Sequence, residues 1–121
     1  MVVDMSNSDV GAWIFNYSGQ YWVPSRSPAA DVNLLRAVET LALSFRFKVW
    51  PVELALEAWL ENADDRADDG INLTTVVIRR TGNGLAEIRD KYGQFDNVHV
   101  PVEEIELIFR SLMEAIEGRL E

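Results

Sequence analysis

The spacing of aromatic side chains over residues 12–18, followed by a turn signal, predicts a β-hairpin over residues 12–23. Between Ala12 and Ser18, the residues Trp13, Phe15 and Tyr17 fall on one face of an extended chain and Ile14 and Asn16 on the other. Ser18-Gly19 then reads as a tight turn, and Gln20 to Val23 as the return strand. We expect 24–28 to be a loop, because its two prolines block regular strand pairing.

The next segment contains one ambiguous stretch and one regular alternation. Residues 31–40 fit either a short helix, capped by Asp31 with Leu34, Leu35 and Val38 inward, or the start of a long strand. From Leu41 to Val49, apolar residues alternate with residues that are small or polar. This period of two predicts a strand with one buried face and one wet face.

Two later segments show the helical period, and a β-rich stretch separates them. Pro51 fits the first turn of a helix whose apolar stripe is Val52, Leu56, Trp59, Leu60 and Ala63. Pro101 starts a last helix with the stripe Ile105, Ile108, Phe109, Leu112, Ala115, Ile116 and Leu120. Residues 73–81, 85–92 and 95–100 read as a three-strand meander, with a turn at Gly82-Asn83-Gly84.

The order of these elements predicts an α+β fold. Short turns favour antiparallel neighbours, so we expect one antiparallel sheet of about five or six strands with two helices packed on one face. The 121 residues fit a single domain, 1–121, in which 1–10 form a flexible polar lead.

The composition and the first residues of the sequence indicate the cellular compartment. The chain has no cysteine, its first residues lack the basic and apolar regions of a signal peptide, and no apolar run approaches about 18 residues. We therefore expect a cytoplasmic protein.

Negative charge is concentrated in two segments. The formal net charge is −9, to which residues 53–69 contribute −6 and residues 101–121 contribute −4. Such a chain repels nucleic acid and anionic membranes, so a basic protein is its natural partner. The alternative is that the acidic residues only keep a small protein soluble.

The candidate partner-binding residues are acidic or aromatic. Glu53, Glu57 and Glu61 recur every four residues along one exposed edge of the predicted helix, where ionised carboxylates suit recognition of Arg or Lys; an ordinary wet helix face is the alternative. An acidic loop follows them, with Asp64, Asp65, Asp68 and Asp69. The aromatic candidates of the hairpin either bind a partner or cover one end of the core, and they are Trp13, Tyr17, Tyr21 and Trp22.

The residues offer no catalytic or metal-binding pattern. Counting from Gly70, a calcium loop would need oxygen ligands at Ala67 and Val76, and neither supplies one. His99 is the only histidine, and the sequence has no cysteine or nucleophile-elbow serine that it could activate as a general base. We therefore interpret it as a partly exposed structural residue. Arg79, Arg80, Arg89 and Lys91 are expected to pair across the meander with Glu87 and Asp90. We expect a non-enzyme without metal or cofactor.

Two segments carry a family resemblance. Residues 44–54 (SFRFKVWPVEL) pass from a strand into an acidic helix, and residues 98–105 (VHVPVEEI) lead into a long final helix. In size, acidity and element order, residues 40–120 resemble the immunity proteins that protect bacteria from their own polymorphic or contact-dependent growth inhibition toxins. The resemblance implies a cytoplasmic inhibitor of a cognate toxin domain, often a basic nuclease.

Two other interpretations remain open at this point. One is a small ligand-binding or enzymatic domain with a pocket between sheet and helices. The other is a structural subunit that oligomerises through the aromatic hairpin. The sequence fixes neither the toxin nor the oligomeric state.

Overall fold

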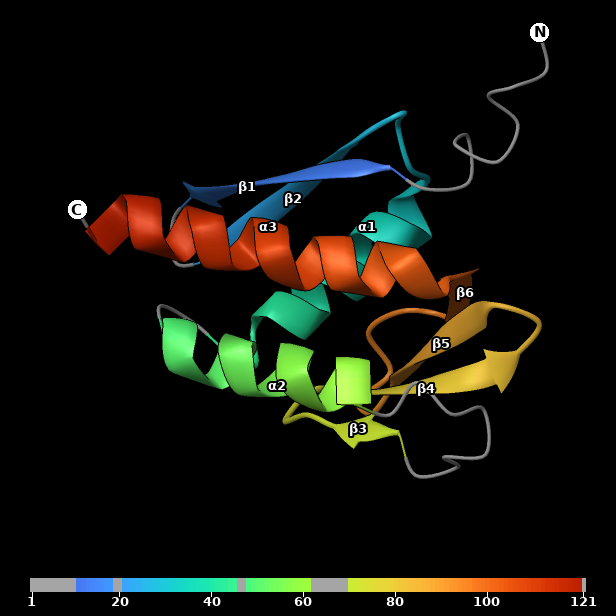
Figure 1. The fold of residues 1–121 in the computed structure, drawn as a ribbon. Coiled ribbons are helices and arrows are strands. Elements are labelled where there is room, and N and C mark those ends of the chain that lie inside the picture. Colours follow the sequence, from blue (N-terminus) through green and yellow to red (C-terminus); the bar gives the residue numbers. More distant parts are fainter. Residues whose placement is uncertain (1–10, 19–20, 46–47, 62–69, 121) are drawn as a thin grey trace, which may run out of the picture.

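The computed structural model describes residues 11–18, 21–45, 48–61 and 70–120 (Figure 1). Two strands come first, and two helices follow them. A four-strand segment and a long helix complete the chain. The elements in order are β1 (Ala12–Ser18), β2 (Tyr21–Ser27), α1 (Val32–Ala42), α2 (Val49–Glu61), β3 (Ile71–Asn72), β4 (Val76–Gly82), β5 (Leu85–Asp90), β6 (Val98–Pro101) and α3 (Val102–Leu120).

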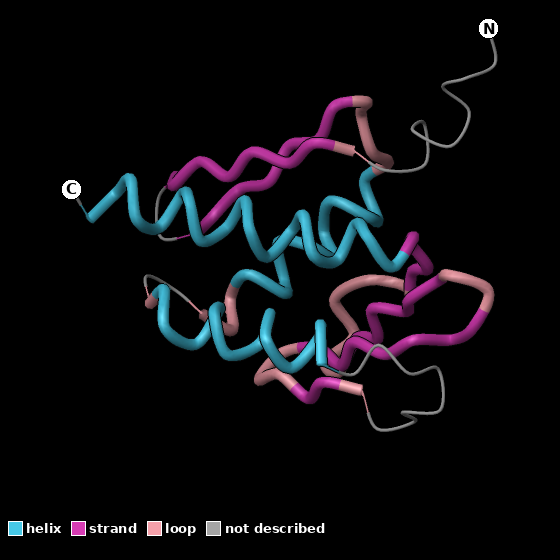
Figure 2. Tube along the Cα trace, viewed as in Figure 1, coloured by secondary structure: helices cyan, strands magenta, loops and turns pink. Residues whose placement is uncertain are grey.

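The strands form two separate antiparallel sheets, with helices between them. One sheet is the β1–β2 hairpin, and the other has the order β3-β4-β5-β6. Figure 2 shows α3 running across the middle of the molecule, between the hairpin and the half that holds α2 and the larger sheet. The buried core fills the space among these layers, with Trp59, Phe109 and Leu41 as its largest fully buried side chains.

The α+β class is confirmed, but the predicted single sheet with two helices is wrong. The strand expected over 41–49 does not form. Leu41 and Ala42 are the last residues of α1, 43–45 form a turn, and Val49 already belongs to α2; 46–47 lie outside the described residues. Ala37, Val38 and Leu41 are fully buried at helical spacing, so the first residues of the predicted strand are the last residues of a helix with a buried apolar side.

The helical alternative for 31–40 is confirmed. Asp31 is the N-cap of α1, and its carboxylate accepts a hydrogen bond of 2.8 Å from the Leu34 N–H. The two predicted helices also form, with starts at Val49 and Val102. Their stripes are largely buried, although Leu60 is 44% exposed, and Ala63 and the Leu120 side chain lie outside the described parts.

The strand predicted over 73–81 forms only from Val76 onward, and a separate two-residue strand, β3, precedes it. β3 ends at Asn72 and β4 begins at Val76, because Thr75 turns toward the end of α1. The Thr75 hydroxyl donates to the Thr40 carbonyl at 2.6 Å, and its N–H donates to the Ser44 hydroxyl at 3.2 Å. These bonds hold the turn between the two strands.

β2 continues through Pro24 to Ser27, so the loop predicted over 24–28 is wrong for most of its length. Two residues separate the paired positions Ser18 and Tyr21, and hydrogen-bonded and non-hydrogen-bonded pairs alternate along the hairpin from there. Pro24 opposite Phe15 falls on a non-hydrogen-bonded pair, so its nitrogen faces away from β1. A proline is tolerated in a strand at such an edge position.

A buried carboxylate fixes the hairpin on α3. Glu104 is 1% exposed and accepts hydrogen bonds from Trp13 Nε1 at 2.7 Å, Arg26 Nε at 2.6 Å and Arg26 Nη2 at 3.1 Å. We call these three residues the Glu104 cluster. Gly11 leaves room for it, since a Cβ there would lie 2.3 Å from Arg26 Nε. Both β-strands of the hairpin are thereby tied to one turn of α3.

Replacing Glu104 by Gln should destabilise the fold by about 3–5 kcal/mol, because it leaves the buried Arg26 guanidinium without a counter-charge. Glu114→Gln on the exposed side of the same helix is the control and should change stability by no more than about 0.5 kcal/mol. Urea denaturation followed by tryptophan fluorescence measures both. Equal losses in the two variants would contradict a structural role for the cluster.

Candidate interaction surface

The three glutamates of α2 lie on its solvent side, as predicted. Glu53, Glu57 and Glu61 are exposed, whereas the opposite side of the helix is buried through Val52, Ala55, Leu56 and Trp59. This division follows from the 3.6-residue period of the helix. The loop acids Asp64, Asp65, Asp68 and Asp69 lie outside the described residues.

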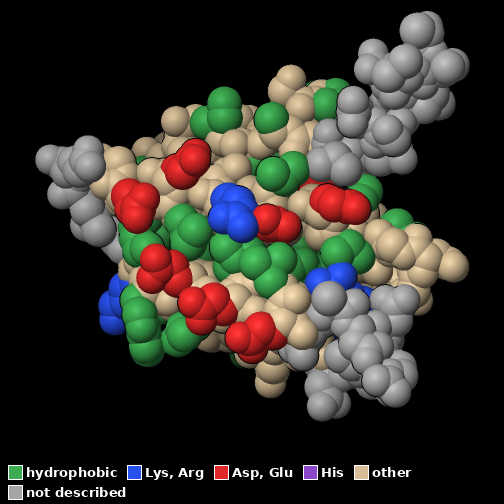
Figure 3. Space-filling model, viewed as in Figure 1, with side chains coloured by type: hydrophobic (Ala, Val, Ile, Leu, Met, Phe, Trp, Pro, Cys, Tyr) green, Lys and Arg blue, Asp and Glu red, His purple; other side chains and the backbone are tan. Residues whose placement is uncertain are grey.

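α3 packs beside α2 and adds a second row of carboxylates. Figure 3 shows acidic side chains along both helices, with apolar side chains in the seam between them. Within this surface, Arg110 pairs with Glu106 at 2.8 Å. We define the acidic helical face as Glu53, Glu57, Glu61, Glu103, Glu106, Arg110, Glu114 and Glu117. Its seven carboxylates and one guanidinium give it a strongly negative formal charge.

The α3 carboxylates were not among the predicted site residues. Their signal in the sequence was the −4 charge of residues 101–121, and the structure places α3 next to α2, which contains the described part of the −6 segment. Sequence periodicity predicted both helices but could not place them side by side, because that placement depends on long-range packing.

Large apolar side chains accompany the acids of α2. Trp50 is 68% exposed and Leu54 is 46% exposed, and both lie on the solvent side of the helix. Leu54 also lines a shallow groove of about 350 Å³ between α2 and β3, together with Pro51, Ala58 and Leu73. None of the described residues that line this groove has a titratable side chain, so this part of the surface suits apolar contact rather than proton transfer.

The four aromatic candidates of the hairpin have different surroundings. Trp13 and Trp22 are buried and belong to the core. Tyr17 is partly buried, with its ring edge-on to Trp22 at a centroid distance of 5.3 Å. Tyr21 is 51% exposed and points to the opposite face of the hairpin. Of these residues, Tyr21 is therefore the one with most surface available to a partner.

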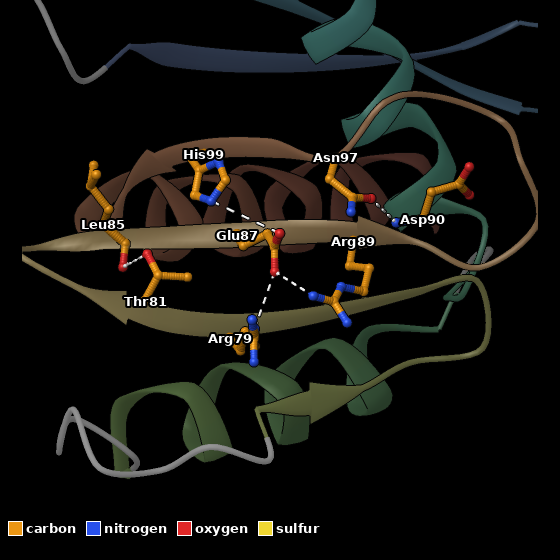
Figure 4. Close-up of polar contacts among 8 residues, drawn as sticks. All are labelled: Arg79, Thr81, Leu85, Glu87, Arg89, Asp90, Asn97 and His99. Atoms are coloured by element: carbon orange, nitrogen blue, oxygen red, sulfur yellow. Dashed lines mark hydrogen bonds and ion pairs between the residues drawn. The ribbon is translucent and has the colours of Figure 1, made fainter.

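The larger sheet has an outer face with mixed charge (Figure 4). Glu87 of β5 is contacted by Arg79 Nε at 3.1 Å and by Arg89 Nη2 at 3.4 Å, and His99 Nε2 lies 3.9 Å away. The predicted cross-strand pairing is confirmed for Arg79 of β4 with Glu87 of β5, whereas Arg89 contacts Glu87 along the same strand. Two arginine side chains around one glutamate give this cluster a net positive formal charge, in contrast to the helical face.

The other two bases of the meander have different partners. The Arg80 guanidinium lies 4.2 Å from the centroid of the Trp59 ring, and its Nη2 donates to the Trp59 carbonyl at 2.9 Å. Lys91 donates to the Leu73 carbonyl. The described residues contain no group of three or more His, Asp or Glu side chains placed to hold a metal ion.

Asp90 organises the turn that follows β5. Its carboxylate accepts hydrogen bonds from the N–H groups of Tyr92 at 3.0 Å and Phe95 at 3.1 Å, and its own N–H donates to the Asn97 side chain at 2.9 Å. Desolvation raises the pKa of the Asp90 carboxyl, but the backbone N–H groups of 92–95 together outweigh it and hold the pKa below its ordinary value.

Asp90→Asn should therefore destabilise the protein in a pH-dependent way. A lowered folded-state pKa means that the stabilisation is complete above the unfolded value of about 3.9 and disappears as the pH falls through the folded value. We expect the wild type to exceed the variant in unfolding free energy at pH 7 and the difference to shrink below about pH 4. Denaturation curves at pH 7, 5 and 3 measure this, with Asp96→Asn on the same loop as the charge control. A pH-independent difference would contradict it.

The comparisons with known proteins identify no relative. No family model, no curated protein and no solved structure matches the chain. None of the described helices combines the length and apolar character that crossing a membrane requires. The function must therefore be argued from the surfaces described above.

Proposed function

We propose that this protein binds a basic protein through its acidic helical face and acts as the immunity protein, or inhibitor, of a bacterial toxin domain. The observation that supports the proposal is the alignment of carboxylates on two adjacent helices, α2 and α3, with exposed Trp50, Leu54 and Leu60 on α2. Protein interfaces typically have aromatic and apolar anchors at their centre and a polar rim around them.

The charge of this face suits a nuclease as the toxin. A nuclease carries Lys and Arg side chains that hold nucleic-acid phosphates, and a row of glutamates can occupy the same groups. Complementary charge accelerates the encounter and orients the partners, while apolar anchors supply affinity once water is excluded. On this proposal the glutamates act mainly on the association rate, and Trp50 acts mainly on the dissociation rate.

Reversing charge on the helical face should slow association with the toxin. The candidate toxin is the product of a neighbouring reading frame, in a catalytically inactive form. Glu53→Lys, Glu57→Lys and Glu61→Lys together should reduce the association rate by about tenfold or more at low salt, with a smaller reduction as salt increases. Stopped-flow or biosensor measurements at several ionic strengths provide the test.

A matched pair of single variants controls for net charge. Glu57→Lys and Asp96→Lys change the formal charge equally, but Asp96 lies in the exposed loop after β5 that contacts α1 through its backbone. Only Glu57→Lys should slow association. If both variants slow it equally, or neither does, the acidic helical face is not the interface, and failure of the wild type to protect cells that express the active toxin would reject the inhibitor role.

A further inference from the structure

The outer edge of β1 carries backbone N–H and C=O groups that pair with no described strand. Among the described residues, β1 has a strand neighbour on one side only, which is β2. The alternation that starts at the Ser18–Tyr21 pair directs the N–H and C=O groups of Ile14 toward β2 and those of Trp13 and Phe15 away from it. The hydrogen bond from the Ser25 hydroxyl to the Ile14 carbonyl agrees with this register.

The two edges of the hairpin differ. On β2, the backbone nitrogen of Pro24 faces the outer edge of the hairpin but carries no hydrogen. The row of hydrogen-bonding groups on this edge is therefore interrupted at its centre. β1 contains neither proline nor a charged residue. Natural edge strands are usually protected by charges, prolines or bulges, and the outer edge of β1 has none of these devices.

The outer face of the hairpin is also free of charge. Its residues are Ala12, Ile14, Asn16, Ser18, Tyr21, Val23, Ser25 and Ser27. The one charged residue of the hairpin, Arg26, is directed inward to Glu104. Ile14 is 61% exposed and Val23 is 42% exposed, so apolar side chains are available to pair with those of an added strand.

α3 supplies charge next to this edge. β1 packs on α3 and β2 on α1, so the outer edge of β1 lies on the side of the hairpin away from α1 (Figure 1). On α3, Glu103, Leu107 and Glu114 are exposed. Around the helix axis they lie next to Glu104, on its solvent side. A strand added to β1 would therefore run beside carboxylates.

We infer that β1 recruits an extended strand of the basic partner, whose Lys or Arg side chains face α3 while alternate apolar side chains extend the outer face beside Ile14. This inference rests on the proposed function, since it specifies how the partner is held. A second copy of the chain is a poorer occupant, because pairing two β1 edges would bring two acidic α3 surfaces together.

A synthetic peptide tests the inference without the natural partner. The probe is a fluorescent, capped ten-residue peptide of alternating Lys and Val. It should bind the full-length protein, and binding should slow hydrogen exchange at the Trp13 and Phe15 amides. Methylating the backbone nitrogens of its two central residues, which blocks both peptide edges but keeps every charge, should weaken binding by about tenfold or more.

Two protein variants locate the bound strand. Ile14→Lys and Val23→Lys each add one positive charge at an exposed position of the outer face, but only Ile14 lies on β1, the strand that would pair with the peptide. Ile14→Lys should weaken peptide binding about tenfold, and Val23→Lys less than about threefold. Thermal unfolding should show that both variants remain folded, because both side chains are exposed.

The outcomes separate this inference from the proposed function. Equal binding of the methylated and unmodified peptides, no binding at millimolar peptide in low salt, or equal effects of the two lysine variants would each overturn strand addition. The toxin kinetics of Glu57→Lys would still decide the inhibitor role. Conversely, loss of binding on methylation together with unchanged toxin kinetics would support the β1 edge and reject the acidic helical face.

Discussion

The fold depends on the buried carboxylate of Glu104, which occupies a position on the core side of α3. Isolating Glu104 from water costs several kcal/mol, and Trp13 and Arg26 offset that cost only if the hairpin packs on this turn of α3. The contacts span 91 and 78 residues of sequence, so they are formed by tertiary packing rather than local structure. They explain why the hairpin lies over the helices instead of extending the four-stranded sheet.

Local periodicity predicted most elements but not their assembly. The stripes around Leu56 and Phe109 are long enough for a helix to be distinguished from a strand, and both helices were predicted from them. The run that begins at Leu41 also fits a strand when it is read alone, because an apolar helix end adjoining a turn can mimic alternation. Pro24 misled for a different reason: whether a proline is compatible with a strand depends on which edge remains unpaired. That property belongs to the assembled sheet.

For the candidate site as well, the sequence predicted which side chains are exposed but not which helices lie side by side. Spacing alone placed Glu53, Glu57 and Glu61 on a solvent-facing edge, and their exposure agrees with it. The hairpin alternation that predicted β1 also implied that Trp13 belongs to the inward face, whereas Tyr21 has the opposite phase to Trp22. The sequence therefore contained the distinction between core and surface aromatics. It did not contain the proximity of α2 and α3, which turns two acidic segments into one surface.

The charge on α3 explains how the edge of β1 can lack charges and prolines without promoting self-association. Arg26 is paired with Glu104, so the hairpin has no charged side chain on its outer face. An uncharged edge strand of this kind ordinarily tends to pair with the same edge of an identical chain. The neighbouring carboxylates of α3 oppose that event, because two copies that meet edge to edge would also bring like charges together. The same carboxylates attract a strand with basic side chains. On the strand-addition proposal, negative charge on the helix replaces a lysine on the strand as protection against self-association, and the outer edge of β1 stays unpaired until a partner of opposite charge binds.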